Sequence, residues 1–248
     1  MKNIKTVIIV PCYNEEKRLD TNAFRTYLGR NPDIGVLFVD DGSKDKTFKV
    51  ISDFSAATNG QAQVLKLDKN SGKAEAVRQG IMNSTHSYPE CKYTGYWDAD
   101  LATPLEEIQR FIECLDKNPA QLMAMGARVK LLGREIHRKK ARHYIGRIFA
   151  TFASMTLRLP VYDTQTGAKL FRTGTHIEQI FGTPFQTSWI FDVEIIARLI
   201  SIGNADPSQQ IVEIPLRTWI DVAGSKIKLS DGFKAFFDLL KISRTYFR

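Results

Sequence analysis

Two aspartates, Asp98 and Asp100, follow the short apolar run that ends at Trp97. Carboxylates two residues apart after a strand can approach the same hard divalent cation, and that cation can also bridge a diphosphate. Neutralising the charge of a departing diphosphate lowers a reaction barrier by several kcal/mol. We therefore expect Asp98 and Asp100 to hold a metal ion beside a phosphorylated ligand. The alternative is a solvated pair of carboxylates at a strand end.

Two further polar segments, Pro11–Glu15 and Asp40–Ser43, also follow apolar runs. In open α/β sheets ligands bind beyond the carboxyl ends of the strands, so these segments should converge on one cleft with Asp98 and Asp100. Asp40 and Asp41 would also suit a turn followed by a helix N-cap. Gly72-Lys73 offers backbone N–H groups and an ammonium to phosphate at a predicted helix start, although such glycines often serve only the turn.

The elements that must position these residues alternate between strands and helices. Short apolar runs rich in β-branched residues are each followed by helical spacing, which predicts βαβ units. Because these runs are apolar throughout, the strands should be buried on both faces of a mostly parallel sheet that helices flank. Strands are predicted at Thr6–Val10, Val36–Val39, Val64–Leu67, Tyr93–Trp97 and Leu122–Val129, and helices near Glu15–Arg30, Lys44–Thr58, Gly72–Ser84 and Pro104–Lys117, the last with Thr103 as its cap.

The second half of the chain has a looser pattern, with no internal repeat or linker. Its predicted elements are a basic helix near Lys140–Leu159, a strand Ala168–Phe171, helices Thr173–Phe181 and Ile190–Ile202, and a strand Ile211–Leu216. One continuous domain over 1–248 is the preferred interpretation.

The composition is that of a folded globular protein. The chain has 248 residues, of which 43% are hydrophobic and 25% charged, so disorder and coiled-coil architectures are excluded. The three cysteines have no paired spacing, which argues against a disulfide framework or a zinc site. No apolar stretch approaches the roughly 18 residues of a spanning helix, and the start lacks a secretory signal, so we expect a cytoplasmic protein.

The surplus positive charge is concentrated in two segments. The net charge is +8, and the segments Arg134–Arg147 and Lys226–Arg248 each carry six basic residues. The first adjoins an apolar stripe that we expect to be core, formed by Ile145, Ile148, Phe149, Phe152 and Met155. The second has the pattern of a basic amphipathic helix, which either lies on a membrane surface or docks on the domain.

Four strings, in this order and spacing, resemble the inverting family-2 glycosyltransferases of the GT-A fold: "VIIVPCYNEEKRL", "VLFVDDGSKDKT", "KNSGKAEAVRQG" and "YWDADLATP". The later strings "DTQTGAK", "FDVEIIARL" and "WIDVAGSKI" resemble the branch that uses polyprenyl phosphates, in particular dolichyl-phosphate β-glucosyltransferases. The resemblance covers nearly the whole chain. It implies a nucleotide-sugar-binding half in 1–130, an acceptor half in 131–229 and a C-terminal basic amphipathic helix in 230–248.

The resemblance also assigns roles to individual residues. Asp98 and Asp100 would hold the nucleotide and Mg2+ or Mn2+, and Asp100 would be essential for catalysis. Related mannosyl enzymes often carry Gln where this chain has Ala102, which favours the glucosyl branch and puts a third side-chain metal ligand in doubt. A uridine nucleotide would be held by six further residues. The base and ribose would contact Pro11, Tyr13, Glu15 and Asp40; Asp41 would support the loop, and Lys73 would lie near the diphosphate.

The chemistry of the acceptor decides whether a catalytic base is needed. A phosphate monoester, with a second pKa of about 6, is largely dianionic at neutral pH and needs no base, whereas a sugar hydroxyl must be deprotonated. Asp192 and Glu194 fall where relatives with hydroxyl acceptors place a catalytic carboxylate, but they could equally orient a neighbouring cation or cap a helix. Candidates for binding the acceptor phosphate or bordering its pocket are Arg128, Arg138, Lys139, Arg142, Asp163 and Gln165.

The preferred function is transfer of glucose from UDP-glucose to a polyprenyl or dolichyl phosphate, with inversion, by an enzyme peripheral to the cytoplasmic face of a membrane. One alternative keeps the donor site but uses a soluble or cell-envelope saccharide as acceptor. A remote alternative is a basic nucleic-acid-binding protein without catalysis, which the acidic strand ends disfavour because they would repel phosphates. The sequence indicates no nucleic-acid partner and leaves the oligomeric state open.

Overall fold

The computed structural model describes residues 3–137, 140–203, 206–221 and 229–247, and the side chains of 140–143 and 229–233 are outside the description. Two predicted phosphate-binding residues, Arg138 and Lys139, therefore lie outside the described residues, as does the side chain of Arg142.

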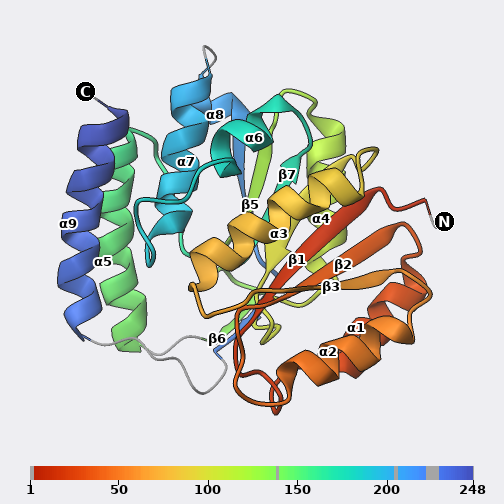
Figure 1. Ribbon diagram of the computed structural model, residues 1–248. Helices are drawn as coiled ribbons and strands as arrows, with labels where there is room; N and C mark the ends of the chain where they lie inside the picture. Colours follow the sequence, from red (N-terminus) through yellow and green to blue (C-terminus); the bar gives the residue numbers. More distant parts are fainter. Residues whose placement is uncertain (1–2, 138–139, 204–205, 222–228, 248) are drawn as a thin grey trace.

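A seven-stranded sheet has the strand order β3-β2-β1-β4-β7-β5-β8. It forms the centre of the molecule, with helices around it (Figure 1). All neighbouring strands are parallel except β7, which runs antiparallel to β4 and β5. The bounds are β1 Thr6–Cys12, β2 Ile34–Asp40, β3 Ala62–Lys66, β4 Tyr93–Trp97, β5 Met123–Ala127, β7 Ala168–Arg172 and β8 Ile211–Pro215. The predicted α/β class with a mostly parallel sheet is confirmed.

Helices cover both faces of this sheet and create two hydrophobic cores. Strand β1 explains why both exist, because Val7 and Ile9 enter one core while Ile8 and Val10 enter the other. Helices α3 Lys73–Ser87, α5 Lys140–Leu157, α6 Thr175–Phe181, α7 Phe191–Ile202 and α9 Leu229–Tyr246 contribute to the first core. Helices α1 Thr21–Arg30, α2 Thr47–Ala56 and α4 Glu107–Lys117 contribute to the second.

Three short elements were not predicted from the sequence. Strands β6 Glu135–His137 and β9 Thr218–Ile220 pair in parallel as a separate two-stranded sheet, and α8 Pro207–Gln210 precedes β8. Three-residue strands carry too little periodicity to be recognised without their partner.

Three predicted helix starts are too early: those at Glu15 and Pro104, and that at Lys44, since α2 begins at Thr47. The reason is visible at the first of them. The helix expected from Glu15 begins at Thr21, after Asp20 accepts hydrogen bonds from the backbone N–H groups of Asn22 and Ala23. The backbone N–H of Glu15 instead donates to Thr47 Oγ1 at 2.7 Å, which holds this segment as a loop. The helix expected from Pro104 begins at Glu107 without a side-chain cap, so the capping role of Thr103 is also wrong.

The apolar stripe of α5 is largely exposed, so the expectation that it is core is wrong. Ile145, Ile148, Phe152 and Met155 lie on the surface. The opposite side of the helix supplies the buried residues, which include Ala153 and Leu157. None of the described helices is long and apolar enough to traverse a bilayer.

Candidate active site

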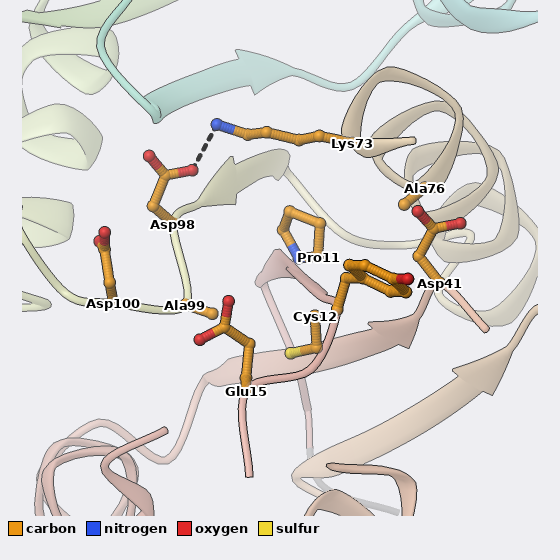
Figure 2. Close-up of a pocket in the computed structure, with 10 residues that line it drawn as sticks. Pro11, Cys12, Glu15, Asp41, Lys73, Ala76, Asp98, Ala99 and Asp100 are labelled. Atoms are coloured by element: carbon orange, nitrogen blue, oxygen red, sulfur yellow. Dashed lines mark ion pairs between the residues drawn. The ribbon is translucent and has the colours of Figure 1, made fainter. Parts of the chain in front are cut away.

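One cleft collects the polar strand ends, at the carboxyl edge of the sheet (Figure 2). Four groups of residues line it: Pro11, Cys12, Tyr13 and Glu15 at the end of β1, Asp41 after β2, Lys73 and Ala76 of α3, and Asp98, Ala99 and Asp100 after β4. The parallel pairing of β1 with β2 and β4 brings these ends together. Every residue that we predicted to bind the nucleotide or the metal therefore lines this cleft, except Asp40.

Asp98 and Asp100 share the cleft with the ammonium of Lys73. The Lys73 Nζ atom lies 2.5 Å from Asp98 Oδ1 (Figure 2). Asp100 Oδ1 accepts a hydrogen bond from the backbone N–H of Ala102. Burial raises the pKa of Asp100, and the negative charge of Asp98 raises it further. Desolvation alone would lower the pKa of Lys73, but the charges of Asp98 and Asp192 outweigh it, so this pKa is raised. The two carboxylates thus form a negative site that favours a cation.

The residues present fit a divalent ion that is shared with a ligand. Among the described residues, no cluster of three or more His, Cys, Asp or Glu side chains could enclose a metal by itself. Mg2+ commonly uses one or two carboxylates together with the phosphates of its substrate. Asp98 and Asp100 supply such a pair at the wall of an open cleft, and Lys73 beside them suits the same phosphates.

Asp40 and Asp41 have different surroundings although they are adjacent. Asp41 accepts hydrogen bonds from the backbone N–H groups of Ser71 at 2.7 Å and Gly72 at 2.9 Å, and from Asn70 Nδ2 at 3.0 Å. It therefore holds the loop that leads into α3 and Lys73. Asp40 is fully buried, and its Oδ2 atom has no hydrogen-bond partner among the described residues. A buried acceptor without a partner is rare in folded proteins and calls for an explanation.

Glu15 stands at the cleft wall in an ion pair with Arg18, whose Nε lies 2.9 Å from Glu15 Oε2. The carboxyl group is largely buried, and the loop around it is tied to α2 through Thr47. Its position is therefore set before any ligand binds.

Arg128 and Asp163 form a buried bidentate ion pair, with Nε–Oδ2 and Nη2–Oδ1 distances of 2.6 and 2.8 Å. Burial opposes the charge of Asp163, but the Arg128 guanidinium holds the pKa of this carboxyl well below its usual range. Both residues lie outside the cleft lining, as does Gln165, whose Nε2 atom is buried without a partner among the described residues. Arg128 is therefore already engaged by a carboxylate.

Lys169 is a buried cation that the sequence interpretation missed. Its ammonium donates to the carbonyl oxygens of Thr164 at 2.9 Å and Thr166 at 2.7 Å, and to Asp192. Asp192 also accepts from the hydroxyl of Tyr96. Burial lowers the pKa of Lys169. A single lysine within the apolar strand segment "AKLF" could have indicated this arrangement, because a buried charge requires a partner.

Glu194 is also enclosed by donors. Its carboxylate is fully buried, pairs with Arg198 at 2.8 Å and accepts from the backbone N–H groups of Gln186 and Thr187 and from the hydroxyl of Tyr246. Neither Asp192 nor Glu194 lines the cleft. Their contacts favour the alternative of orienting a neighbouring cation, and the catalytic-base role stays a prediction.

Comparison with known proteins places the chain among glycosyltransferases. The family "Glycosyl transferase family 2" matches residues 7–178. Dolichyl-phosphate beta-glucosyltransferase ALG5C of Trichomonas vaginalis is 31% identical over 99% of this chain and 72% of its own length. The dolichyl-phosphate beta-glucosyltransferase of Saccharomyces cerevisiae is 31% identical over 96% of this chain and 74% of its own.

Solved structures share the fold at low sequence identity. Glucosyl-3-phosphoglycerate synthase from Mycobacterium tuberculosis, in complex with Mn2+, UDP-glucose and phosphoglyceric acid, has a TM-score of 0.66 at 16% identity, with 97% of this chain and 80% of that chain covered. Staphylococcus aureus TarS 1–349 in complex with UDP-GlcNAc has a TM-score of 0.60 at 14% identity, with 99% and 68% covered. These similarities establish the GT-A architecture of the sheet and helices.

Proposed function

The chain belongs to glycosyl transferase family 2 and is a glycosyltransferase, and we propose that it transfers glucose from UDP-glucose to the phosphate of a polyprenyl lipid such as dolichyl phosphate. The observation that carries the proposal is the meeting of Asp98, Asp100 and Lys73 in one cleft, in a chain whose relatives are named for this reaction. Family membership argues against the alternative of a non-catalytic nucleic-acid-binding protein.

The donor half of the cleft supports a uridine nucleotide. Pro11 and Tyr13, which line the cleft, would flank the base, and Asp40, whose buried Oδ2 atom lies outside this lining, stays our candidate for a contact with the base or ribose. Glu15, which Arg18 holds at the cleft wall, would accept from the ribose hydroxyls. Asp41 would act indirectly, by holding the loop that carries Lys73 to the diphosphate.

Asp98 and Asp100 would hold Mg2+ or Mn2+ against the diphosphate. A divalent cation in this place supplies neutralisation of the charge that develops on the leaving UDP. Lys73 stays protonated at neutral pH because of the neighbouring aspartates, so its ammonium would donate to the same phosphate oxygens. Between them, these residues stabilise the leaving group while the sugar is displaced with inversion.

The acceptor needs positive charge more than it needs a base. A lipid phosphate is already largely dianionic at neutral pH and attacks the anomeric carbon without losing a proton. Asp192 is ion-paired with Lys169, and Glu194 with Arg198, which supports a mechanism without a carboxylate base. Arg138, Lys139 and Arg142 stay our candidates for the acceptor phosphate, and Arg128, Asp163 and Gln165 for the border of its pocket. We place the enzyme peripherally on the cytoplasmic face of the membrane that holds this lipid.

The test is a transfer assay with labelled UDP-glucose, Mg2+ or Mn2+ and dolichyl or undecaprenyl phosphate. We expect wild type to transfer label into the organic phase. The Asp100→Asn variant should not transfer label, and in calorimetry it should bind UDP more weakly in the presence of metal. Asp53→Asn, on the exposed surface of α2, is the matched control and should behave as wild type. Transfer only to a soluble saccharide, without lipid, would overturn the lipid acceptor. Unchanged UDP affinity of Asp100→Asn in the presence of metal would remove this residue from the site.

A further inference from the structure

Helices α5 and α9 lie side by side at one edge of the molecule and both pack against α7 (Figure 1). Each buries one side, α5 through residues such as Ala153 and Leu157, and α9 through Ala235, Leu239 and Ile242. The opposite sides of both helices form a common outward face, called here the α5/α9 face.

The α5/α9 face is apolar where a surface helix would ordinarily be polar. Eight of the twelve large apolar side chains that are exposed in the described part of the chain lie on these two helices. Ile148 is 60% exposed, Met155 69% and Phe237 67%. The rings of Phe152 and Phe236 lie 5.9 Å apart in an edge-to-face contact, so the patch continues from one helix to the other. Concentrated exposed apolar surface of this kind marks an interaction site.

The charges on the same helices are mainly positive. The sequence of α5 contains three basic residues and no acidic residue, and that of α9 contains three basic against two acidic residues. Lys234 and Lys241 are exposed beside the apolar side chains, whereas Asp238 is half-buried. A second copy of this face would bring like charges together, while anionic lipid headgroups complement them.

We propose that the α5/α9 face docks on the surface of an anionic lipid bilayer, with its aromatic and aliphatic side chains in the interfacial layer and its lysines at the headgroups. This arrangement is typical of interfacial amphipathic helices, which bind through buried apolar area together with attraction to anionic lipids. It differs from the sequence expectation, which assigned the α5 stripe to the core.

Helix α5 also contacts the segment that contains Asp163. The Arg147 guanidinium of α5 lies 3.7 Å from the ring centre of Tyr162 and donates to the carbonyl oxygen of Tyr162 at 2.7 Å. The next residue, Asp163, holds Arg128. Docking through α5 and α9 would thus bring the segment that contains Tyr162 and Asp163 toward the lipid headgroups. The identity of the lipid acceptor rests on the proposed function.

Vesicle co-sedimentation of the full chain tests the docking without catalysis. The vesicles contain phosphatidylcholine with or without about one third phosphatidylserine, and neither acceptor nor donor is added. Wild type should bind the anionic vesicles more strongly. Ile148→Gln/Phe237→Gln should lower the partition coefficient by about tenfold or more, because two apolar side chains no longer leave water. Phe48→Gln, on the exposed surface of α2, is the matched apolar control and should not change it.

Two variants that each replace two lysines by glutamine separate attraction to the headgroups from insertion of apolar side chains. Lys234→Gln/Lys241→Gln should reduce the preference for anionic vesicles, whereas Lys46→Gln/Lys49→Gln, at the start of α2, should retain it. Equal binding of the α5/α9 variants and their controls would overturn the proposal. So would a wild-type dimer in sedimentation that Ile148→Gln/Phe237→Gln converts to monomer, because the face would then join two copies.

Transfer of glucose to a short-chain polyprenyl phosphate in detergent distinguishes this inference from the proposed function. All four variants should retain the wild-type rate there, since no bilayer is involved. If transfer is retained and the α5/α9 substitutions leave vesicle binding unchanged, only the docking face is refuted. Vesicle binding that responds as expected, with no transfer to any lipid phosphate, refutes only the proposed function.

Discussion

Gly167 leaves room for the carboxylate of Asp98: a Cβ atom added at position 167 would lie 1.9 Å from Asp98 Oδ2 and 2.1 Å from its Cγ. The contact arises because β7 runs antiparallel to β4, with Ala168 opposite Trp97, and because the backbone N–H of Asp98 donates to the carbonyl oxygen of Gly167 at 2.9 Å. Gly167, the residue directly before β7, thereby limits where a candidate metal ligand after β4 can point.

Gly167→Ala should therefore keep the fold and impair the site. The Asp98 side chain can rotate away from the new methyl group at little cost to the core, but it then leaves its place beside Asp100 and Lys73. We expect metal-dependent UDP binding to weaken by about tenfold or more, with a thermal unfolding midpoint close to wild type. Gly29→Ala, in α1, is the matched control, because the added carbon meets no described atom within 4 Å beyond its chain neighbours and the backbone of its own helix. Wild-type UDP affinity in Gly167→Ala would refute the positioning role.

The buried pair Lys169–Asp192 should behave as a structural unit. Lys169→Met leaves the Asp192 charge buried with the Tyr96 hydroxyl as its remaining donor among the described residues, so the free energy of unfolding should fall by about 3–5 kcal/mol. Lys169→Met/Asp192→Leu removes both charges and should recover much of this loss in a urea-denaturation double-mutant cycle. An Asp192→Asn enzyme as stable as wild type but without turnover would instead support the catalytic-base prediction.

Glu194 should matter for stability rather than for turnover. Glu194→Gln leaves the Arg198 guanidinium buried without its countercharge, and we expect the free energy of unfolding to drop by about 3 kcal/mol. Turnover per folded molecule should stay within about twofold of wild type. Glu113→Gln makes the same change at an exposed glutamate of α4 and is the control. A stable but inactive Glu194→Gln protein would show that the carboxylate takes part in the reaction.

The Arg128–Asp163 pair predicts a pH dependence of stability. Because the folded pKa of Asp163 is depressed, its ion pair stabilises the protein above the ordinary aspartate pKa of about 4, and this contribution is lost as the pH falls further toward the folded value. Asp163→Asn lacks the contribution at every pH. Urea denaturation should therefore show wild type about 3–5 kcal/mol more stable than Asp163→Asn at pH 7, with a smaller difference at about pH 3. A constant difference across this range would contradict the assignment.

The sequence predicted the central strands and the convergence of their ends for a local reason. Runs such as Thr6–Val10 are apolar on both faces, so only a sheet covered on both sides can bury them. Polar residues directly after such runs, Asp98 and Asp100 above all, must then emerge at one edge. Both inferences use only neighbours in the chain.

The sequence by itself determined the fold class, the family and most of the polar residues at the cleft, because local patterns and motif spacing contain that information. Tertiary structure alone decided the partners of buried charges, such as Lys169 with Asp192 and Arg128 with Asp163, since each pair joins residues more than twenty positions apart. It also decided that the α5 stripe faces outward. A helical apolar period looks the same whether a core or a lipid surface lies opposite. The two are distinguished by the burial of Ala153 and Leu157 in the core, where α5 packs against α7 and α9.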